Sequence, residues 1–210
     1  ILDGWSMSQV LEEIFNTYSL LAKNNANELE AVSINDASID IYKYIGKQNR
    51  YYAKSFWKNY LNGREINTQI PFGANKGIEA SSDSETLELD FYVDEESTKA
   101  LAEITKNNVT TASIVLSAWG LLLQMAAGAD EAVFGSVVSG RNIQIEEVNS
   151  AVGMFINTVP ICTSLQEGEA FIDSVKRLQE DLVNAEQYSY YPLYEIQSDM
   201  NQGNPVISHT

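Results

Sequence analysis

Ile1-Leu2-Asp3-Gly4-Trp5-Ser6 is the stretch from which the rest of the chain can be placed. Two apolar residues run directly into Asp-Gly, and the amphipathic pattern of a helix follows. This order is typical of the end of a buried strand that turns into a helix. Asp3 therefore stands between apolar residues and a glycine turn, and we expect its carboxylate to be buried.

A buried carboxylate needs a partner, because an unpaired charge in a protein interior is costly. Arg141 is the best candidate among the 13 Lys and Arg residues, since it ends an apolar strand and follows Gly140. We therefore hypothesise an Asp3–Arg141 ion pair that clamps the turn. The alternative is that Asp3 merely caps the first helix, a common role of Asp.

The composition is that of a globular protein with a sizeable core. Of the 210 residues 44% are hydrophobic, and 13 Lys and Arg stand against 29 Asp and Glu, a net charge of −16. A nucleic acid or an anionic membrane would need a basic surface, so neither is an expected partner. Cys162 is the only thiol, which excludes an intrachain disulfide and favours a reducing cytoplasm. No apolar run reaches the length of about 20 residues that spans a bilayer.

Helical patterns dominate the first third of the chain. Ser6 is predicted to cap a helix, with Gln9 completing a capping box. A second helix is expected over about residues 39–61, whose aromatic side chains we interpret as core anchors rather than as a ligand site. From 62 to 84, Gly, Asn, Ser and Pro predict a loop, the best internal boundary. The apolar face of the first helix comprises Met7, Val10, Leu11, Ile14, Tyr18, Leu21 and Ala22.

Strands and helices alternate in the remainder. Residues 87–93 alternate apolar with polar, which predicts a half-buried strand. Asp94 is expected to cap the next helix, and residues 111–127 predict a helix buried on several sides that ends at Gly128. Further strands are predicted at 132–138 and 152–162, with Pro160 at an edge or bulge. A helix over Phe171 to Leu182 and a short one beginning with Pro192 in its first turn complete a mixed α/β class.

The side chains present exclude several kinds of active site. His209 is the only histidine and lies near the end of the chain in a polar setting. With one Cys and one His, a zinc site of the usual ligands is not expected, and we predict no metal. A Ser-His-Asp or Cys-His arrangement would have to use His209. Gly135 and Gly140 lack the spacing of a phosphate-binding loop.

Several blocks nevertheless resemble one family in the same order along the chain. Asp3-Gly4-Trp5-Ser6 resembles the end of the His-His-x-x-x-Asp-Gly motif of nonribosomal peptide synthetase condensation domains. Residues 133–141, ending in Ser139-Gly140-Arg141, are similar to its Gly-x-x-x-Ser-Gly-Arg block. Residues 152–160, with Phe155-Ile156-Asn157-Thr158, are similar to its Val-Gly-Leu-Phe-Ile-Asn-Thr-Leu-Pro block. Residues 191–197 and Gly203-Asn204-Pro205 match two later blocks.

The resemblance implies a chloramphenicol-acetyltransferase-like fold, a mixed α+β two-layer sandwich in two lobes with a tunnel between them. Residues 1–62 would be the tail of the N-terminal lobe, 63–84 a linker, and 85–210 most of the C-terminal lobe. The implied partners are upstream and downstream peptidyl carrier protein domains and a neighbouring adenylation domain. No cofactor is expected to bind directly, because substrates arrive on the phosphopantetheine arms of the carriers.

The resemblance also implies roles for individual residues. Asp3 and Gly4 are what this chain contains of the catalytic motif, and the family's Asp is usually structural, commonly through an Arg such as Arg141. Trp5 and Ser6 complete the block, and Ser139 and Asn157 lie in blocks near the tunnel. For the last two, the alternative is a purely structural role with satisfied polar groups.

The sequence departs from the family pattern in one respect. Both motif histidines would lie upstream of Ile1, and the family's domain is roughly twice as long, so the lobe is truncated at both ends. We therefore expect the polypeptide as written to be inactive, although its parent would form amide bonds between carrier-bound thioesters. Ordinary condensation with an L-amino-acid donor is preferred. The alternatives are a non-catalytic carrier-docking module, a heterocyclisation domain, or an acyltransferase of the same fold.

Overall fold

The computed structural model of the chain describes residues 2–23, 37–64, 68 and 89–200. In order these form α1 (Gly4–Ala22), α2 (Ala37–Lys47), α3 (Arg50–Leu61), α4 (Glu95–Thr105), α5 (Thr111–Ala127), β1 (Glu131–Val138), a 3-10 turn (Val148–Ser150), β2 (Asn157–Ser164), α6 (Phe171–Glu186) and α7 (Leu193–Asp199). Ile1, nearly all of the predicted loop at 62–84, the Gly203-Asn204-Pro205 block and His209 lie outside the described residues.

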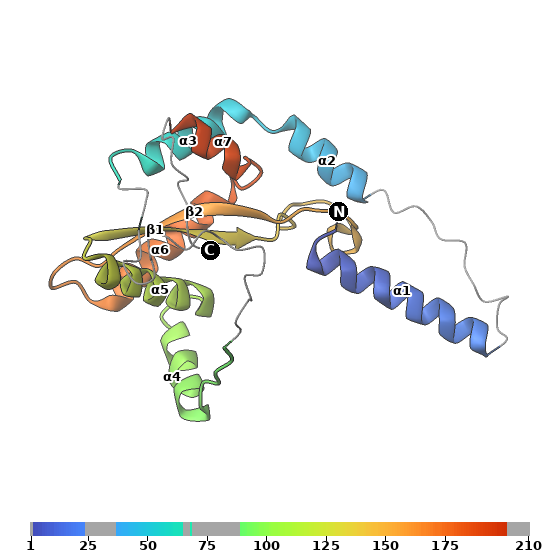
Figure 1. Cartoon of the computed structure of the whole chain (residues 1–210), viewed down its shortest axis with the longest axis horizontal. Coiled ribbons are helices and arrows are strands. Elements are labelled where there is room, and N and C mark those ends of the chain that lie inside the picture. The colour runs from blue at the N-terminus through green and yellow to red at the C-terminus, as the bar shows by residue number, and fades with distance from the viewer. Residues whose placement is uncertain (1, 24–36, 65–67, 69–88, 201–210) are drawn as a thin grey trace, which may run out of the picture.

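A two-stranded antiparallel hairpin lies at the centre of the described structure (Figure 1). Its register runs without a bulge from Glu131 opposite Ser164 to Val138 opposite Asn157, and Pro160 lies opposite Gly135. The amide of Cys162 donates outward from β2 to the hydroxyl of Tyr60, at 3.0 Å. Because a strand repeats every two residues, the nitrogen of Pro160 faces the same outer edge. The predicted edge position of Pro160 is confirmed, and this proline removes no hydrogen bond of the hairpin.

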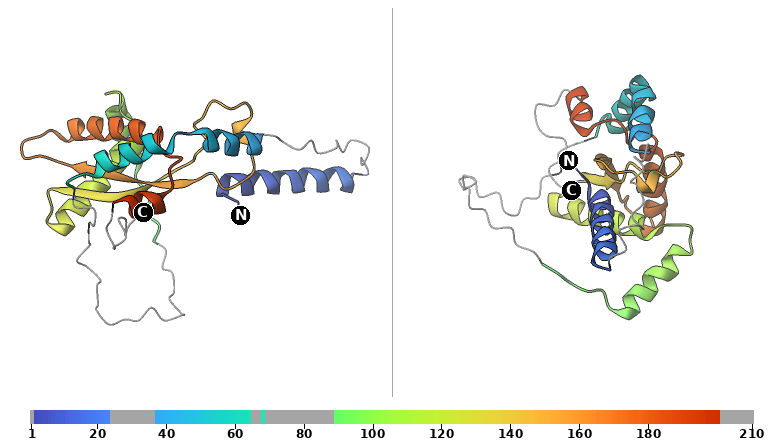
Figure 2. Two further views of the ribbon diagram at one scale, coloured as in Figure 1. Left: turned by 90° about the horizontal axis from the view of Figure 1, so that it is seen from above. Right: turned by 90° about the vertical axis from the view of Figure 1, so that its right-hand side faces the viewer.

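The main core forms where helices pack against this hairpin. Helix α5 packs on both strands and on α6, α6 also packs on β2, and α7 contacts β2 and α3. Trp57 of α3, Phe134 of β1 and Ile161 of β2 are almost completely buried in this core. Figures 1 and 2 show α1 extending away from this part of the molecule. The mixture of helices and strands confirms the predicted class.

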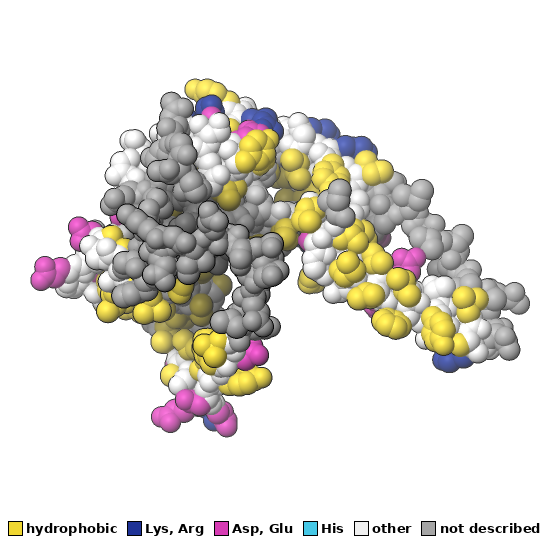
Figure 3. Space-filling model, viewed as in Figure 1, with side chains coloured by type: hydrophobic (Ala, Val, Ile, Leu, Met, Phe, Trp, Pro, Cys, Tyr) yellow, Lys and Arg dark blue, Asp and Glu magenta, His cyan; other side chains and the backbone are white. Residues whose placement is uncertain are grey.

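Helix α1 carries its apolar residues on a surface that nothing in the described structure covers. Leu11, Ile14 and Tyr18 follow the predicted spacing but are each at least 45% exposed. Figure 3 shows hydrophobic side chains along the face of α1 turned to the viewer. The outer side of α5, including Leu122 and Met125, is exposed as well, so the prediction that α5 is buried on several sides is only partly right.

Three predicted helix starts differ from the structure. Helix α1 begins at Gly4 with Asp3 as its N-cap, so the Ser6–Gln9 capping box does not form. The single helix expected over 39–61 is divided, because the side chain of Asn49 accepts the amides of Tyr51 and Tyr52 and starts α3 there. Pro192 is the N-cap of α7 rather than a residue of its first turn.

The helix caps predicted further along the chain are confirmed. Asp94 caps α4 by accepting the amide of Ser97 at 2.7 Å. Helix α5 has the predicted limits, and Gly128 follows it with the left-handed φ of 63°. These boundaries were predictable because each is set by one residue and its immediate neighbours.

Two predicted strands differ from the structure. Residues 89–93, the described part of the strand predicted at 87–93, pair with no described strand, and Leu89 and Tyr92 are 89% and 95% exposed. The strand predicted at 152–162 begins only at Asn157. The backbone of residues 153–155 is bound to the start of α1 instead of to β1, which gives this segment its function in the site.

Candidate functional site

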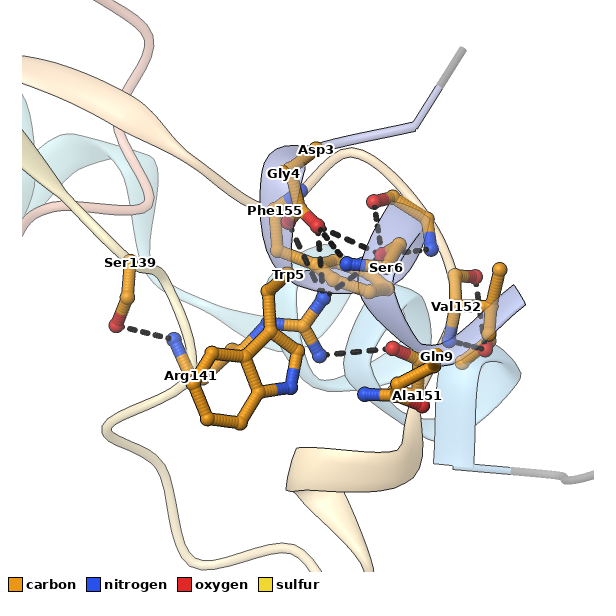
Figure 4. A network of polar contacts seen from close by, with 12 residues as sticks. Asp3, Gly4, Trp5, Ser6, Gln9, Ser139, Arg141, Ala151, Val152 and Phe155 are labelled. Carbon is orange, nitrogen blue, oxygen red and sulfur yellow. Dashed lines mark hydrogen bonds and ion pairs between the residues drawn. The ribbon is translucent and has the colours of Figure 1, made fainter. Parts of the chain in front are cut away.

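Asp3 is the centre of a buried polar cluster that joins α1 to the connection between β1 and β2 (Figure 4). Its backbone is extended, with φ −83° and ψ 169°, and its Oδ1 accepts the amide of Ser6 at 2.8 Å. Its own amide donates to the carbonyl of Gly153 at 3.1 Å. Only 2% of Asp3 is exposed. Asp3 is therefore the N-cap of the first helix.

Arg141 pairs with the same carboxylate. Its Nη2 lies 3.2 and 3.1 Å from the two oxygens of Asp3, and both side chains are buried. Its Nη1 donates to the carbonyls of Val148 and Ala151 at 3.0 and 2.8 Å. The guanidinium also lies 4.7 Å from the ring centroid of Phe155. The hypothesised ion pair is confirmed, and Asp3 caps the helix and binds Arg141 at the same time.

Ser6 completes the link between the two segments. Its Oγ lies 2.6 Å from Asp3 Oδ1 and 2.9 Å from the carbonyl of Gly153, and its single hydrogen donates to one of these acceptors at a time. The same oxygen accepts the amide of Gly153 and Nη2 of Arg141, both at 3.0 Å. Ser6 thus connects Asp3, Arg141 and Gly153 through hydrogen bonds, and it is not the helix cap that the sequence predicted.

The surroundings of Asp3 keep it ionised. Burial by itself raises the pKa of its carboxyl group, but hydrogen bonds from the Ser6 side chain, from the amides of Ser6 and Phe155, and from Arg141 outweigh burial. The resulting pKa is about 2. A carboxylate with so low a pKa is a poor general base at neutral pH. Its chemistry is that of a clamp, which fixes the start of α1 against residues 148–155.

Trp5 and Gly4 have different roles from those of the buried cluster. The indole of Trp5 is 56% exposed, and its Nε1 donates to the carbonyl of Asn149 at 2.7 Å. Gln9, one helical turn later, donates to the same carbonyl. Gly4 is the first residue of α1 rather than part of a tight turn, and a Cβ there would meet no described atom within 4 Å. The expected glycine turn is therefore wrong.

Ser139 and Asn157 lie on either side of the same connection, and described partners satisfy both. Ser139 Oγ accepts the amide of Arg141 at 3.2 Å. Asn157 Nδ2 donates to the carbonyls of Ser189 and Tyr191, at 2.7 and 3.0 Å, and so ties β2 to the segment before α7. These contacts are structural, and neither side chain hydrogen-bonds to Asp3. Their predicted place beside a tunnel stays a prediction.

Sequence reasoning missed Phe155 and Gln9 as contributors to the site. Phe155 donates its amide to Asp3 at 3.3 Å and packs with Ala37 and Ile41 of α2. The spacing of Gln9 from Trp5, one turn of helix, was the available signal for their shared acceptor. Phe155 gave no such signal, because its role depends on the path of the backbone.

Metal-ligand clusters and membrane-spanning helices are both absent from the described residues. They contain no group of three or more His, Cys, Asp or Glu side chains that could hold a metal ion. No described helix is long and apolar enough to cross a membrane.

Comparison with solved structures defines the fold. The first condensation domain of the calcium-dependent antibiotic synthetase, in complex with a substrate analogue, matches with a TM-score of 0.72 at 17% identity, over 97% of this chain and 44% of that one. A holo four domain nonribosomal peptide synthetase bound to AMP and glycine matches with a TM-score of 0.77 at 21% identity, over 98% of this chain and 16% of that one. The architecture is that of condensation domains, which confirms the predicted fold.

Sequence comparison identifies the family. The family model described as "Condensation domain" matches residues 1–210. A plipastatin synthase component of Bacillus subtilis (strain 168) and tyrocidine synthase 3 of Brevibacillus parabrevis are each 35% identical over all of this chain. The chain spans 8% and 3% of the length of these two relatives. The chain belongs to the condensation domain family, as its motifs predicted.

Proposed function

We propose that this chain is part of an enzyme that forms an amide bond between two carrier-bound aminoacyl or peptidyl thioesters. The observation that carries the proposal is the Asp3–Arg141–Ser6 cluster at the start of α1, in a chain that matches the family along its whole length. In such a reaction the amine of the acceptor attacks the acyl carbon of the donor, and the donor carrier's thiol leaves. The substrates would be attached to phosphopantetheine arms, with carrier and adenylation domains as partners.

In this proposal the cluster positions the end of the motif, where α1 begins, rather than reacting with substrate. Asp3 is buried, ionised and hydrogen-bonded at both oxygens, so it holds the residues around it in one geometry. A fixed geometry is what a positioning contribution to catalysis requires. Ser139 and Asn157 would support the same region through their backbone contacts. The cytoplasmic setting expected from the sequence stays a prediction.

The test is single-turnover peptide formation by the full-length protein with two loaded carrier proteins, followed by mass spectrometry of the carrier-bound product. We expect the carrier-bound product to form. Asp3→Asn should slow product formation while both carriers still bind. Carrier binding without any product from the full-length protein would support a docking module instead.

A further inference from the structure

A cavity of about 450 Å³ lies beside the Asp3 cluster, and Phe155 belongs to both. Helix α2, the segment that follows β1, and the end of α6 with the turn after it surround the cavity. Its volume falls within the range of about 300–1,000 Å³ that is usual for small-molecule sites. The cavity is therefore large enough for an amino-acid side chain.

The lining of the cavity combines aliphatic and aromatic residues with the polar residues Asn142, Gln187 and Ser189 and with one acidic residue. Ile45 from α2, Ile143 from the connection and Val183 from α6 supply aliphatic surface, and Phe155 supplies a ring. Glu186, in the last turn of α6, is the only charged residue in the lining. Such a lining suits a ligand that combines a hydrocarbon chain with a positive charge.

Glu186 differs from the other partly buried acids in having no partner among the described residues. Glu195 is paired with Arg50, Asp199 with Lys54, and Glu169 with Arg177. Asp181 lies near the hydroxyl of Tyr60, at 3.5 Å. The carboxylate of Glu186, half-buried at the cavity, forms no hydrogen bond or ion pair with any described side chain or backbone group. It is thus free to bind a cation that enters the cavity.

The cavity shares a wall with the motif cluster. Phe155 lines the cavity, while its amide donates to Asp3 and its ring lies beneath Arg141. Gly140, next to Arg141, lines the cavity as well. A ligand held there would lie next to the motif residues Asp3 and Arg141.

We propose that this cavity binds the side chain of a basic amino acid, with the aliphatic stem against Ile45, Ile143 and Val183 and the terminal ammonium paired with Glu186. The assignment to a substrate rests on the proposed function, since it makes the ligand part of an aminoacyl thioester. The pairing itself depends only on the cavity and its charge.

The test measures binding of two probes to the full-length protein by calorimetry. Lysinamide carries a terminal ammonium on its side chain, and norleucinamide has a closely similar aliphatic chain that ends in a methyl group. We expect lysinamide to bind about tenfold more tightly, the effect of one charge-assisted hydrogen bond. Glu186→Gln should abolish this preference, and Val183→Trp should block both probes. Glu180→Gln, on an exposed position of the same helix, should change neither affinity.

Equal affinity of the two probes would overturn the proposal and indicate an uncharged ligand. A preference that survives Glu186→Gln would assign the ammonium to another acid and overturn it too, as would the absence of binding by either probe. Peptide formation is measured separately. Product formation without a lysinamide preference would leave the proposed function intact and refute this inference, whereas the preference without product would do the reverse.

Discussion

Arg141 and Asp3 lie 138 residues apart in the chain, and their side chains meet with Nη2 within 3.2 Å of both carboxylate oxygens. Arg141 also donates to two carbonyls of the connection between β1 and β2. The pair therefore holds three segments together: the start of α1, the end of β1 and residues 148–151. Buried ion pairs contribute little more to folding stability than apolar residues of similar size would. Removing one partner is nevertheless costly, because the other charge is left buried and unpaired.

A double-mutant cycle on Asp3 and Arg141 measures this coupling. We expect Asp3→Ala and Arg141→Ala each to lower the free energy of unfolding by about 3–5 kcal/mol. The double variant should lose less than the sum, with a coupling of about 2 kcal/mol in urea denaturation. The exposed Glu95–Lys99 pair on α4 is the control, with a coupling of about 0.5 kcal/mol or less. Equal coupling in the two pairs would contradict a buried clamp.

The pKa of Asp3 predicts a specific loss of stability in acid. The pKa is lowered in the folded chain from 3.8 to about 2, so the folded state binds this proton less readily than the unfolded state does. The stabilisation is complete above about pH 4 and is lost as the pH falls toward 2, amounting to about 2 kcal/mol. Urea denaturation between pH 6 and pH 2 should show a smaller decrease for Asp3→Asn than for the unaltered chain. Parallel curves would refute the low pKa.

The ion pair was predictable from sequence, but the full cluster was not. An Asp placed between an apolar pair and a helix must find a partner, and Arg141 was a suitable one at the end of an apolar strand. The largely apolar sequence of residues 152–162 does not reveal that the backbone of Gly153 and Phe155 binds Ser6 and Asp3 instead of β1. The hydrogen-bond partners of those amides are set by residues that are distant in the sequence.

The exposed apolar face of α1 shows that packing between elements was equally unpredictable from local sequence. The three- and four-residue spacing of Leu11, Ile14 and Tyr18 specified a helix with one apolar face, and that helix forms. Periodicity reports which side chains share a face, but it carries no information on what covers the face. The local caps at Asp94 and Gly128 were predicted correctly because both halves of each interaction lie within a few residues.

Asn157 provides a prediction on the link between β2 and α7. Asn157→Ala removes both hydrogen bonds to the carbonyls of Ser189 and Tyr191 and should lower the free energy of unfolding by about 1–3 kcal/mol. Asn184→Ala, on an exposed position of α6, should change it by about 0.5 kcal/mol or less. Thermal and urea unfolding of both variants measure the difference. A loss no larger than that of the control would mean that the two carbonyls find other partners.

Alanine substitutions at Gly140 and Gly128 distinguish the cost of an unfavourable backbone conformation from the cost of steric overlap. Both have a left-handed φ, 66° and 63°, so alanine at either position should cost about 1 kcal/mol for the conformation alone. A Cβ at Gly128 meets no described atom, whereas at Gly140 it would collide with the carbonyl of Phe155. Gly140→Ala must therefore displace Phe155, whose amide binds Asp3. We expect this variant to lose at least about 2 kcal/mol more than Gly128→Ala in urea denaturation, in the range of an overpacked site. Equal losses would show that the connection yields without disturbing the cluster.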